Sequence, residues 1–376
     1  MDHLVSLRPL DGFVVGITAD RRWEEQAELL ARRGATVMHG PTITTLYLAS
    51  DENLRQATVA IIEDPPDYLV ATTGIGMRAW LESAAAWGFT DALVSALRGT
   101  KIVARGPKAA AALQIGGLEA WQRSPNEQMG GLTEILLGED LAGRRVAIQE
   151  YGVANPELEQ LLGAVGASVV TIPVYRWRLP DDPDPARRLV KAVCEGQVDA
   201  VTFTSAPAVH NLFAVAAEMD QSEELRRAFN GPVAAACVGP VCASGAVAEG
   251  VADPITPNVG RLGLLVRLLG EHLGQRRRTM RLAGHKVVIQ GGAVEVDGEV
   301  AQLSPKERSI LGLLLRKPGA VVARNTFLGR IWGSTTADAH LLEVAVGRLR
   351  RRLGPAGAAL QAIPGRGYRL DPDETS

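Results

Sequence analysis

Hydroxyl side chains, an arginine and glycines stand where short apolar runs give way to helix-like segments. Thr72-Thr73 and Thr204-Ser205 follow two such runs, and Arg105-Gly106 and Val238-Gly239 follow two others. A helix that begins at such a point offers unpaired backbone N–H groups and a partial positive charge, which favour anions. The same hydroxyls are also typical helix N-caps, so a purely structural role is the alternative. The candidate ligand-binding residues are Thr72, Thr73, Arg105, Thr204, Ser205 and Gly239.

A second group of candidate residues is basic and lies towards the C-terminus. Residues 276–370 carry 17 Lys and Arg against 6 Asp and Glu, a net charge of +11. Residues 1–275 have a net charge of −10, so the value of −2 for the whole chain conceals the asymmetry. A basic segment on an otherwise acidic chain indicates a polyanionic partner.

Length and composition set the class of protein. A chain of 376 residues predicts two or three domains, and 46% hydrophobic with 22% charged residues is typical of a globular protein. No apolar run approaches the ~20 residues that span a bilayer, and the first residues lack the features of a signal peptide. The three cysteines, Cys194, Cys237 and Cys242, lie in no metal-type spacing. We therefore expect a cytoplasmic protein with buried thiols, no metal, no cofactor and no membrane partner.

The acidic part of the chain repeats itself. DYLVATTGIGMRAWL, from Asp67, recurs as DAVTFTSAPAVHNLF, from Asp199, and three further blocks recur at offsets of 131 to 133 residues. A constant offset across four blocks indicates a duplicated unit, here residues 12–141 and 143–273.

Each copy alternates apolar, strand-like runs with helix-period segments. In the first copy the strands are predicted at Phe13–Thr18, Leu69–Thr73 and Lys101–Ala104, and the helices at Trp23–Arg33, Gly76–Trp87 and Pro107–Ile115. This alternation predicts parallel strands joined by crossover helices. GIGMRA, at 74–79, matches a dinucleotide-binding fingerprint, but no acidic residue ends the following strand, so we interpret it as a tight strand-to-helix turn.

Three motifs together resemble the uroporphyrinogen-III synthases: DAVTFTSAP, the helix start VGPVCASGA and the segment PVYRW between the copies. The resemblance implies an α/β fold of two flavodoxin-like domains with an interleaved chain. Residues 44–172 would form one domain, and 12–40 with 177–273 the other. The cleft between them would hold the linear tetrapyrrole hydroxymethylbilane and close it into a ring. Tyr175 occupies the place of a tyrosine implicated in catalysis in that family; packing at a domain hinge is the alternative for it.

The basic segment contains its own series of elements. After a linker predicted at 274–281, HKVVIQ, AVEVDG and EVAQL are typical short strands. A helix is predicted after Ser304, with Pro305 at its first position and Glu307 completing a capping box. A second helix is predicted at 324–332. A third, at 337–353, is expected to bury Leu341, Leu342, Val344, Ala345 and Leu349.

In order and spacing, LSPKERSILGLLL, PGAVVARNTFLGRIWG, HLLEVAVGRLRRRLG and IPGRGYRL resemble the winged helix-turn-helix domain of OmpR/PhoB-type regulators, over 282–371. The resemblance implies double-stranded promoter DNA as partner. Helix 337–353 would enter the major groove, and the wing at Arg366 would touch the minor groove or backbone. The candidate DNA-binding residues are His340, Arg348, Arg350, Arg351, Arg352 and Arg366. No phosphorylated receiver precedes this domain in the sequence, so no phosphorelay is expected.

Two functions are open at this point. In the first, the protein is a transcriptional regulator whose synthase-like module senses a tetrapyrrole, another polycarboxylate or a partner regulator protein. In the second, it is an active uroporphyrinogen-III synthase with an appended DNA-binding domain. The first is favoured because the DNA-binding motifs are intact, whereas TTGIG and ITADRR depart from the turns usual in the synthases. Both a monomer and a homodimer are compatible with the sequence.

Overall fold

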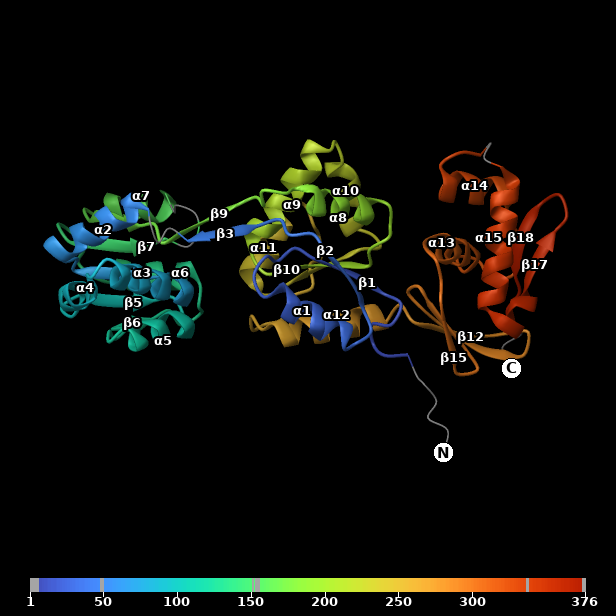
Figure 1. Cartoon of the computed structure of the whole chain (residues 1–376), viewed down its shortest axis with the longest axis horizontal. Helices are drawn as coiled ribbons and strands as arrows, with labels where there is room; N and C mark the ends of the chain where they lie inside the picture. Colours follow the sequence, from blue (N-terminus) through green and yellow to red (C-terminus); the bar gives the residue numbers. More distant parts are fainter. Residues whose placement is uncertain (1–6, 48–50, 151, 153–155, 336–337, 374–376) are drawn as a thin grey trace, which may run out of the picture. The chain divides into compact units, whose positions relative to one another are not determined.

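The computed structural model describes residues 7–47, 51–150, 152, 156–335 and 338–373 (Figure 1). The chain forms two compact units. Unit 1 comprises Met1–Thr42 and Asp181–Ser376, and unit 2 comprises Ile43–Pro180. Among the described residues, no helix is long and apolar enough to cross a membrane.

Unit 2 is built on five parallel strands in the order β6-β5-β4-β7-β8. Their bounds are Gln122–Arg123 (β6), Lys101–Ala104 (β5), Tyr68–Ala71 (β4), Arg145–Gln149 (β7) and Ser168–Ile172 (β8). Alternate residues of β4 face opposite cores, because Leu69 packs with Trp80 whereas Val70 packs with Leu132. Both faces of the sheet are therefore covered, as the continuous apolar strands predict.

The helices of unit 2 cover the two faces unequally. On the side of Leu69 lie α2 (Glu52–Glu63), α3 (Gly74–Ala86), α4 (Thr90–Leu97) and α5 (Pro107–Ile115). On the side of Val70 lie α6 (Met129–Leu137) and α7 (Pro156–Ala164). A separate antiparallel ribbon joins β3 (Thr44–Tyr47) to β9 (Tyr175–Arg178).

Unit 1 contains a second parallel sheet, in the order β11-β10-β1-β2. The bounds are Ala234–Cys237 (β11), Ala200–Phe203 (β10), Val14–Ile17 (β1) and Thr36–His39 (β2), and Ile255 adds a parallel bridge beside β11. One face packs on α1 (Trp23–Ala31) and α12 (Leu262–Gly274) (Figure 1). The remaining helices are α8 (Asp184–Cys194), α9 (Ala206–Glu218), α10 (Ser222–Phe229) and α11 (Pro240–Ala248).

The two sheets exchange strands between the copies of the duplicated sequence. Unit 1 combines β1 and β2 of the first copy with β10 and β11 of the second, and unit 2 combines β7 and β8 of the second copy with β4, β5 and β6 of the first. If β1 counts as the first strand of one sheet and β7 as the first strand of the other, the orders β2-β1-β10-β11 and β8-β7-β4-β5-β6 both begin 2-1-3-4. This is the strand order of flavodoxin-like folds. The predicted interleaved α/β fold is thus confirmed.

The C-terminal part of unit 1, from β12 to β18, is a winged helix. It starts with an antiparallel sheet of β12 (Arg278–Leu282), β13 (His285–Gln290), β14 (Ala293–Val296) and β15 (Glu299–Gln302). Helices α13 (Pro305–Leu314), α14 (Arg324–Trp332) and α15 (Ala339–Arg352) follow, with short strand β16 (Val322–Ala323) before α14. The wing is the hairpin of β17 (Leu360–Ile363) and β18 (Gly367–Leu370). The predicted capping box of Ser304 and Glu307 is present at α13.

Two local predictions differ from the structure. Residues 274–281 are predicted as a linker, yet Arg278–Leu282 form β12, because Met280 and Leu282 alternate inward onto the winged-helix core. The expected burial of Leu341 and Val344 is also wrong, since their side chains are 45% and 38% exposed. The buried stripe of α15 instead runs through Leu342, Ala345, Val346 and Leu349. Apolar residues at adjacent positions left the rotational phase of this helix ambiguous.

Candidate functional site

The first candidate site lies at the carboxyl ends of β4 and β7 in unit 2. Thr73 caps α3, because its Oγ1 accepts from the backbone N–H of Gly76 at 3.1 Å. Thr72 is buried, and its Oγ1 donates to the carbonyl of Gln149 at 2.8 Å. The Gln149 side chain in turn accepts from the backbone N–H of Thr73 at 3.0 Å. Of the two predicted threonines, only Thr73 is partly exposed at this edge.

Gln149 is a residue that the sequence reasoning missed. It is fully buried at the end of β7, and it joins this strand to the turn that opens α3. A buried glutamine that closes the apolar run RVAIQ was the available signal. Its neighbour Glu150 is half-buried; desolvation, reinforced by Glu159, raises the pKa of its carboxyl above the usual value, and Arg176 partly opposes this.

Tyr175 lies at this same edge of unit 2. Its side chain is buried, its hydroxyl is 3.4 Å from Oγ1 of Thr73, and its ring centroid is 6.0 Å from that of Trp177. The structure therefore brings Tyr175 together with Thr73. A phenol hydroxyl beside a helix N-terminus can donate to, or accept from, a ligand that reaches this edge.

Arg105 and the glycines of GIGMRA complete the edge of unit 2. Arg105 follows β5 and is partly exposed, and Gly106 begins the approach to α5, which has Pro107 at its first position. A Cβ at Gly74 would lie 2.2 Å from the carbonyl oxygen of Lys108, and one at Gly76 would lie 2.1 Å from the Gln149 amide. These glycines are thus required for close packing of the turn, in agreement with its interpretation as a tight strand-to-helix turn.

Unit 1 carries a corresponding edge at the carboxyl ends of β1, β10 and β11. Ser205 caps α9 by accepting from the N–H of Ala208 at 3.4 Å, which repeats the role of Thr73 at an offset of 132 residues. Thr204 is exposed, whereas Thr72, its counterpart, is buried. Gly239 is buried with an extended backbone and caps α11. Thr18, at the end of β1, donates to the carbonyl of Thr202 at 2.9 Å.

These edges coincide with the switch points of the two sheets. In open α/β sheets, ligands bind outside the carboxyl ends of the strands, where the strand order reverses. That point lies between β7 and β4 in unit 2, beside Thr73, and between β1 and β10 in unit 1, beside Thr204 and Ser205. A helix N-terminus lies at each, that of α3 beside Thr73 and that of α9 beside Ser205, so each edge is suited to anionic groups. Among the described residues, no group of three His, Cys, Asp or Glu could hold a metal ion.

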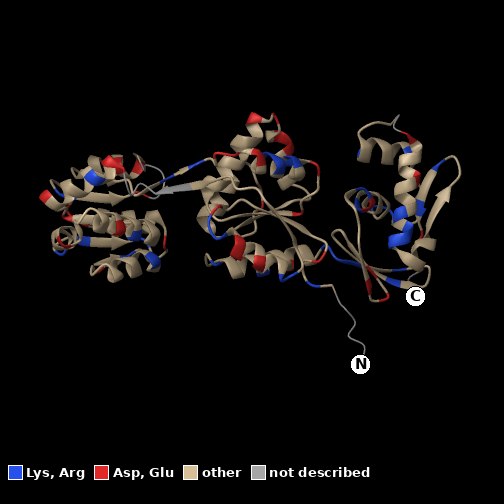
Figure 2. Cartoon of the chain, in the orientation of Figure 1, with Lys and Arg blue, Asp and Glu red and all other residues tan. Residues whose placement is uncertain are grey.

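The candidate nucleic-acid surface is centred on α15, whose C-terminal half carries a run of arginines (Figure 2). Arg348, Arg351 and Arg352 are exposed, and so is His340, whose N–H donates to the capping carboxylate of Asp338. Arg350 differs, because it is half-buried and its Nε donates to the carbonyl of Leu360 in β17 at 2.9 Å. This side chain connects the helix to the wing.

Arg366 and two apolar residues extend this surface. Arg366 is exposed in the turn between β17 and β18. Leu341 and Val344 lie on α15 at helical spacing from Arg348, and all three are exposed. The outward face of the helix therefore combines methyl groups with guanidinium groups, which are the groups that contact thymine methyls, guanine edges and phosphates.

The protein combines an N-terminal α/β region, which contains two interleaved sheets, with a C-terminal winged helix. The family model described as uroporphyrinogen-III synthase HemD matches residues 24–266, and the chain belongs to this family. The model described as transcriptional regulatory protein, C terminal, matches residues 298–370. A uroporphyrinogen-III synthase-like part is thus fused to an OmpR/PhoB-type domain.

Individual relatives resemble one part or the other. Uroporphyrinogen III synthase from Thermus thermophilus is 31% identical, with a TM-score of 0.60, and the match covers 70% of this chain and 99% of that one. The uncharacterized protein YjjA of Bacillus subtilis is 29% identical over 262 residues, 70% of this chain and 96% of YjjA. The transcriptional regulatory protein CutR of Streptomyces coelicolor is 39% identical over 89 residues, which cover 23% of this chain and only 41% of CutR.

Proposed function

We propose that the protein is a DNA-binding transcriptional regulator whose synthase-like module senses a ligand or a partner protein. The domain division behind this proposal is 12–40 with 177–273, 44–172, and a winged helix at 282–371. The observation that carries the proposal is the outward face of α15, where Arg348, Arg351 and Arg352 are exposed. These basic side chains lie outside the buried apolar cluster of the winged helix.

The DNA partner follows from charge and geometry. Residues 276–370 have a net charge of +11, and basic side chains that bind phosphates release counterions from DNA. The logarithm of the association constant for double-stranded promoter DNA should therefore fall linearly with the logarithm of the salt concentration. His340 and the α15 arginines would contact the major groove, and Arg366 the adjacent backbone or minor groove. Fluorescence anisotropy of the full chain with labelled duplex DNA, at several salt concentrations, tests this. Absence of binding at low salt would contradict it.

The sensing part of the proposal rests on the two carboxyl edges. Each edge would bind carboxylates of a tetrapyrrole or another polycarboxylate by itself, through Thr73, Arg105 and Tyr175 in unit 2 and through Thr204, Ser205 and Gly239 in unit 1. A ligand that binds only the folded state raises the melting temperature by mass action. A thermal-shift screen with uroporphyrinogens, other tetrapyrroles and simple polycarboxylates tests this part. A flat response to all of them would favour a partner protein as the signal.

The second candidate function is uroporphyrinogen-III synthase activity. The observation in its favour is the family membership, together with the position of Tyr175 beside Thr73. Ring closure after loss of a hydroxyl depends on positioning more than on a strong acid or base, and helix N-termini could supply that positioning. The decisive assay supplies hydroxymethylbilane and measures type-III against type-I uroporphyrinogen. Formation of type III that is lost in Tyr175→Phe would establish the enzyme.

A further inference from the structure

The winged helix is joined to the first sheet of unit 1 by an ion pair at the amino end of β10. Asp199 is 3% exposed, and its Oδ2 accepts from the N–H of Val14 at 2.9 Å and from Nη1 of Arg308 at 2.9 Å. The second guanidinium nitrogen of Arg308 contacts the other carboxylate oxygen. Arg308 belongs to α13 of the winged helix, so this pair connects the two parts of unit 1.

The duplication explains why this position accepts an arginine from elsewhere. Asp67 stands at the equivalent place in unit 2, where it accepts from the N–H of Arg145 at 2.8 Å and pairs with Arg144 at 3.0 Å. The residue of unit 1 that corresponds to Arg144 is Phe13. The guanidinium that the first sheet cannot supply comes instead from α13.

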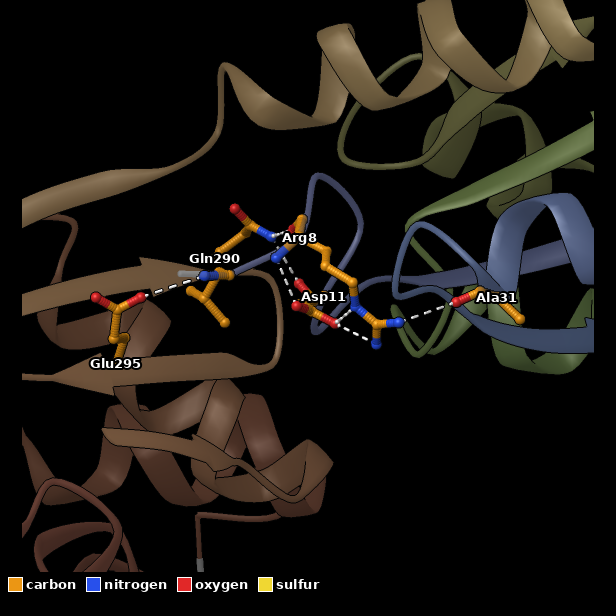
Figure 3. A network of polar contacts seen from close by, with 6 residues as sticks. Arg8, Asp11, Ala31, Gln290 and Glu295 are labelled. Atoms are coloured by element: carbon orange, nitrogen blue, oxygen red, sulfur yellow. Dashed lines mark hydrogen bonds and ion pairs between the residues drawn. The ribbon is translucent and has the colours of Figure 1, made fainter. Parts of the chain in front are cut away.

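The segment before β1 makes the second connection to the winged helix. The Gln290 amide donates to the carbonyls of Arg8 and Asp11 at 2.8 and 2.9 Å, and Arg8 itself pairs with Asp11 (Figure 3). The N–H of Gly292 donates to the carbonyl of Gly12 at 2.6 Å. Gly12 has a φ of +79°, and a Cβ there would lie 2.4 Å from the Gln290 carbonyl oxygen, so glycine is required.

A half-open cavity of about 260 Å³ lies beside the Asp199–Arg308 pair, and both residues line it. Phe13 and Val198 wall it from the first sheet, and Ile289, Leu311 and Leu315 wall it from the winged helix. It lies at the amino ends of β1 and β10, whereas the candidate ligand-binding hydroxyls of unit 1 lie at the carboxyl ends of the same strands. It is therefore a separate site, smaller than the ~300–1,000 Å³ of pockets for drug-sized ligands.

The cavity has an excess of positive charge. Asp199 is the one carboxylate among the lining residues. Four of the lining residues are arginines: Arg276, Arg278, Arg308 and Arg316. Arg276 and Arg278 donate to the neutral carbonyls of Pro232 and Leu315, at 2.5 and 2.8 Å, so these hydrogen bonds do not neutralise their charge. Burial, with the nearby charge of Arg308, lowers the pKa of Arg276, while Asp199 partly opposes this. An anion in the cavity would relieve this repulsion.

We propose that this cavity binds a small organic anion with an apolar body. The body would contact Phe13, Ile289 and Leu311, and the anionic group would pair with Arg276, Arg278 or Arg316. Because both parts of unit 1 contribute to the walls, such a ligand would stabilise the contact between the winged helix and the first sheet. This role is independent of a ligand at the carboxyl edges.

Benzoate is a suitable probe, and uncharged benzamide is its matched control. Isothermal titration of the full chain should give a Kd for benzoate of about 1 mM or tighter, and at least tenfold weaker binding of benzamide. Arg316→Gln, which removes an exposed charge from the lining, should weaken benzoate binding and leave benzamide unchanged. Equal affinity for benzoate and benzamide would overturn the proposal. The absence of benzoate binding up to about 10 mM would overturn it as well.

The site is located by filling the cavity from α13. Gly312 lines the cavity, and a Cβ there meets no atom within 4 Å. Gly312→Phe places a ring in the open space, and Gly312→Ala changes helix propensity similarly without filling it. Benzoate binding should fall at least tenfold in Gly312→Phe and persist in Gly312→Ala, with both melting temperatures at or above that of the parent. Benzoate binding that survives in Gly312→Phe would place the ligand elsewhere and refute the assignment.

Discussion

Replacement of Arg308 by glutamine tests the connection between the winged helix and the first sheet. The Asp199 side chain is 4% exposed and that of Arg308 is 29% exposed. Removal of one partner from a buried pair costs about 3–5 kcal/mol, because the remaining charge loses its compensation. Arg308 is partly solvated, and the N–H of Val14 still donates to Asp199, so we expect Arg308→Gln to lower the free energy of unfolding of unit 1 by about 2–3 kcal/mol.

The internal repeat supplies a matched control. Arg144→Gln removes the guanidinium from Asp67, but these two side chains are 56% and 36% exposed, so the expected cost is about 0–1 kcal/mol. Asp199→Asn and the double variant complete a cycle with Arg308→Gln, and the coupling energy isolates the pair. Urea unfolding followed by circular dichroism provides the free energies, with the transition of each compact unit fitted separately because a two-unit chain need not unfold in one step.

Two results would show that the Asp199–Arg308 pair does not hold the winged helix on the first sheet. If Arg308→Gln costs no more than Arg144→Gln, the ion pair does not hold the winged helix on the sheet. A coupling energy near zero in the cycle would lead to the same conclusion, even if the single variants are destabilised. The loss must also appear in the transition of unit 1, since both partners lie in that unit.

Three further predictions concern DNA binding, pH and thiols. Arg351→Ala should weaken duplex DNA binding by about 1–3 kcal/mol in anisotropy titrations and leave the melting temperature unchanged. Arg350→Ala should instead lower the melting temperature, because Arg350 donates a hydrogen bond to the Leu360 carbonyl. Burial raises the pKa of Glu150, so its contribution to stability is greatest below the unfolded pKa and is lost as pH rises through the folded value. Glu150→Gln should therefore raise the melting temperature at pH 7, and the gain should shrink as pH falls through the raised folded pKa and be lost by pH 4.5; a gain independent of pH would contradict this. Burial also raises the pKa of Cys194 to about 11, so native protein should resist iodoacetamide at pH 8 while urea-unfolded protein is alkylated.

Much of the fold was predictable because the duplicated pattern repeats local signals. The strand Lys101–Ala104 and the helices Pro107–Ile115 and Arg324–Trp332 were predicted with the bounds found, since proline, glycine or a change of period marks their ends. The phase of α15 was not, because Leu341 and Leu342 are adjacent and either can face the core. Gln149 and Arg308 were missed for another reason. Their roles depend on partners 76 and 109 residues away, which no local pattern reveals.

The position of Asp199 links the proposed functions physically. β10 is four residues long, so Asp199 at its amino end and Thr204-Ser205 at its carboxyl end are separated by a single buried strand. A ligand that orders the turn at Ser205 acts on the same strand whose other end holds Arg308 of the winged helix. Such a ligand changes DNA affinity only if it binds more tightly to one arrangement of the winged helix than to another. The Arg308→Gln variant therefore also separates sensing from DNA binding, because it should abolish any effect of a ligand on DNA affinity while the exposed arginines of α15 continue to bind DNA.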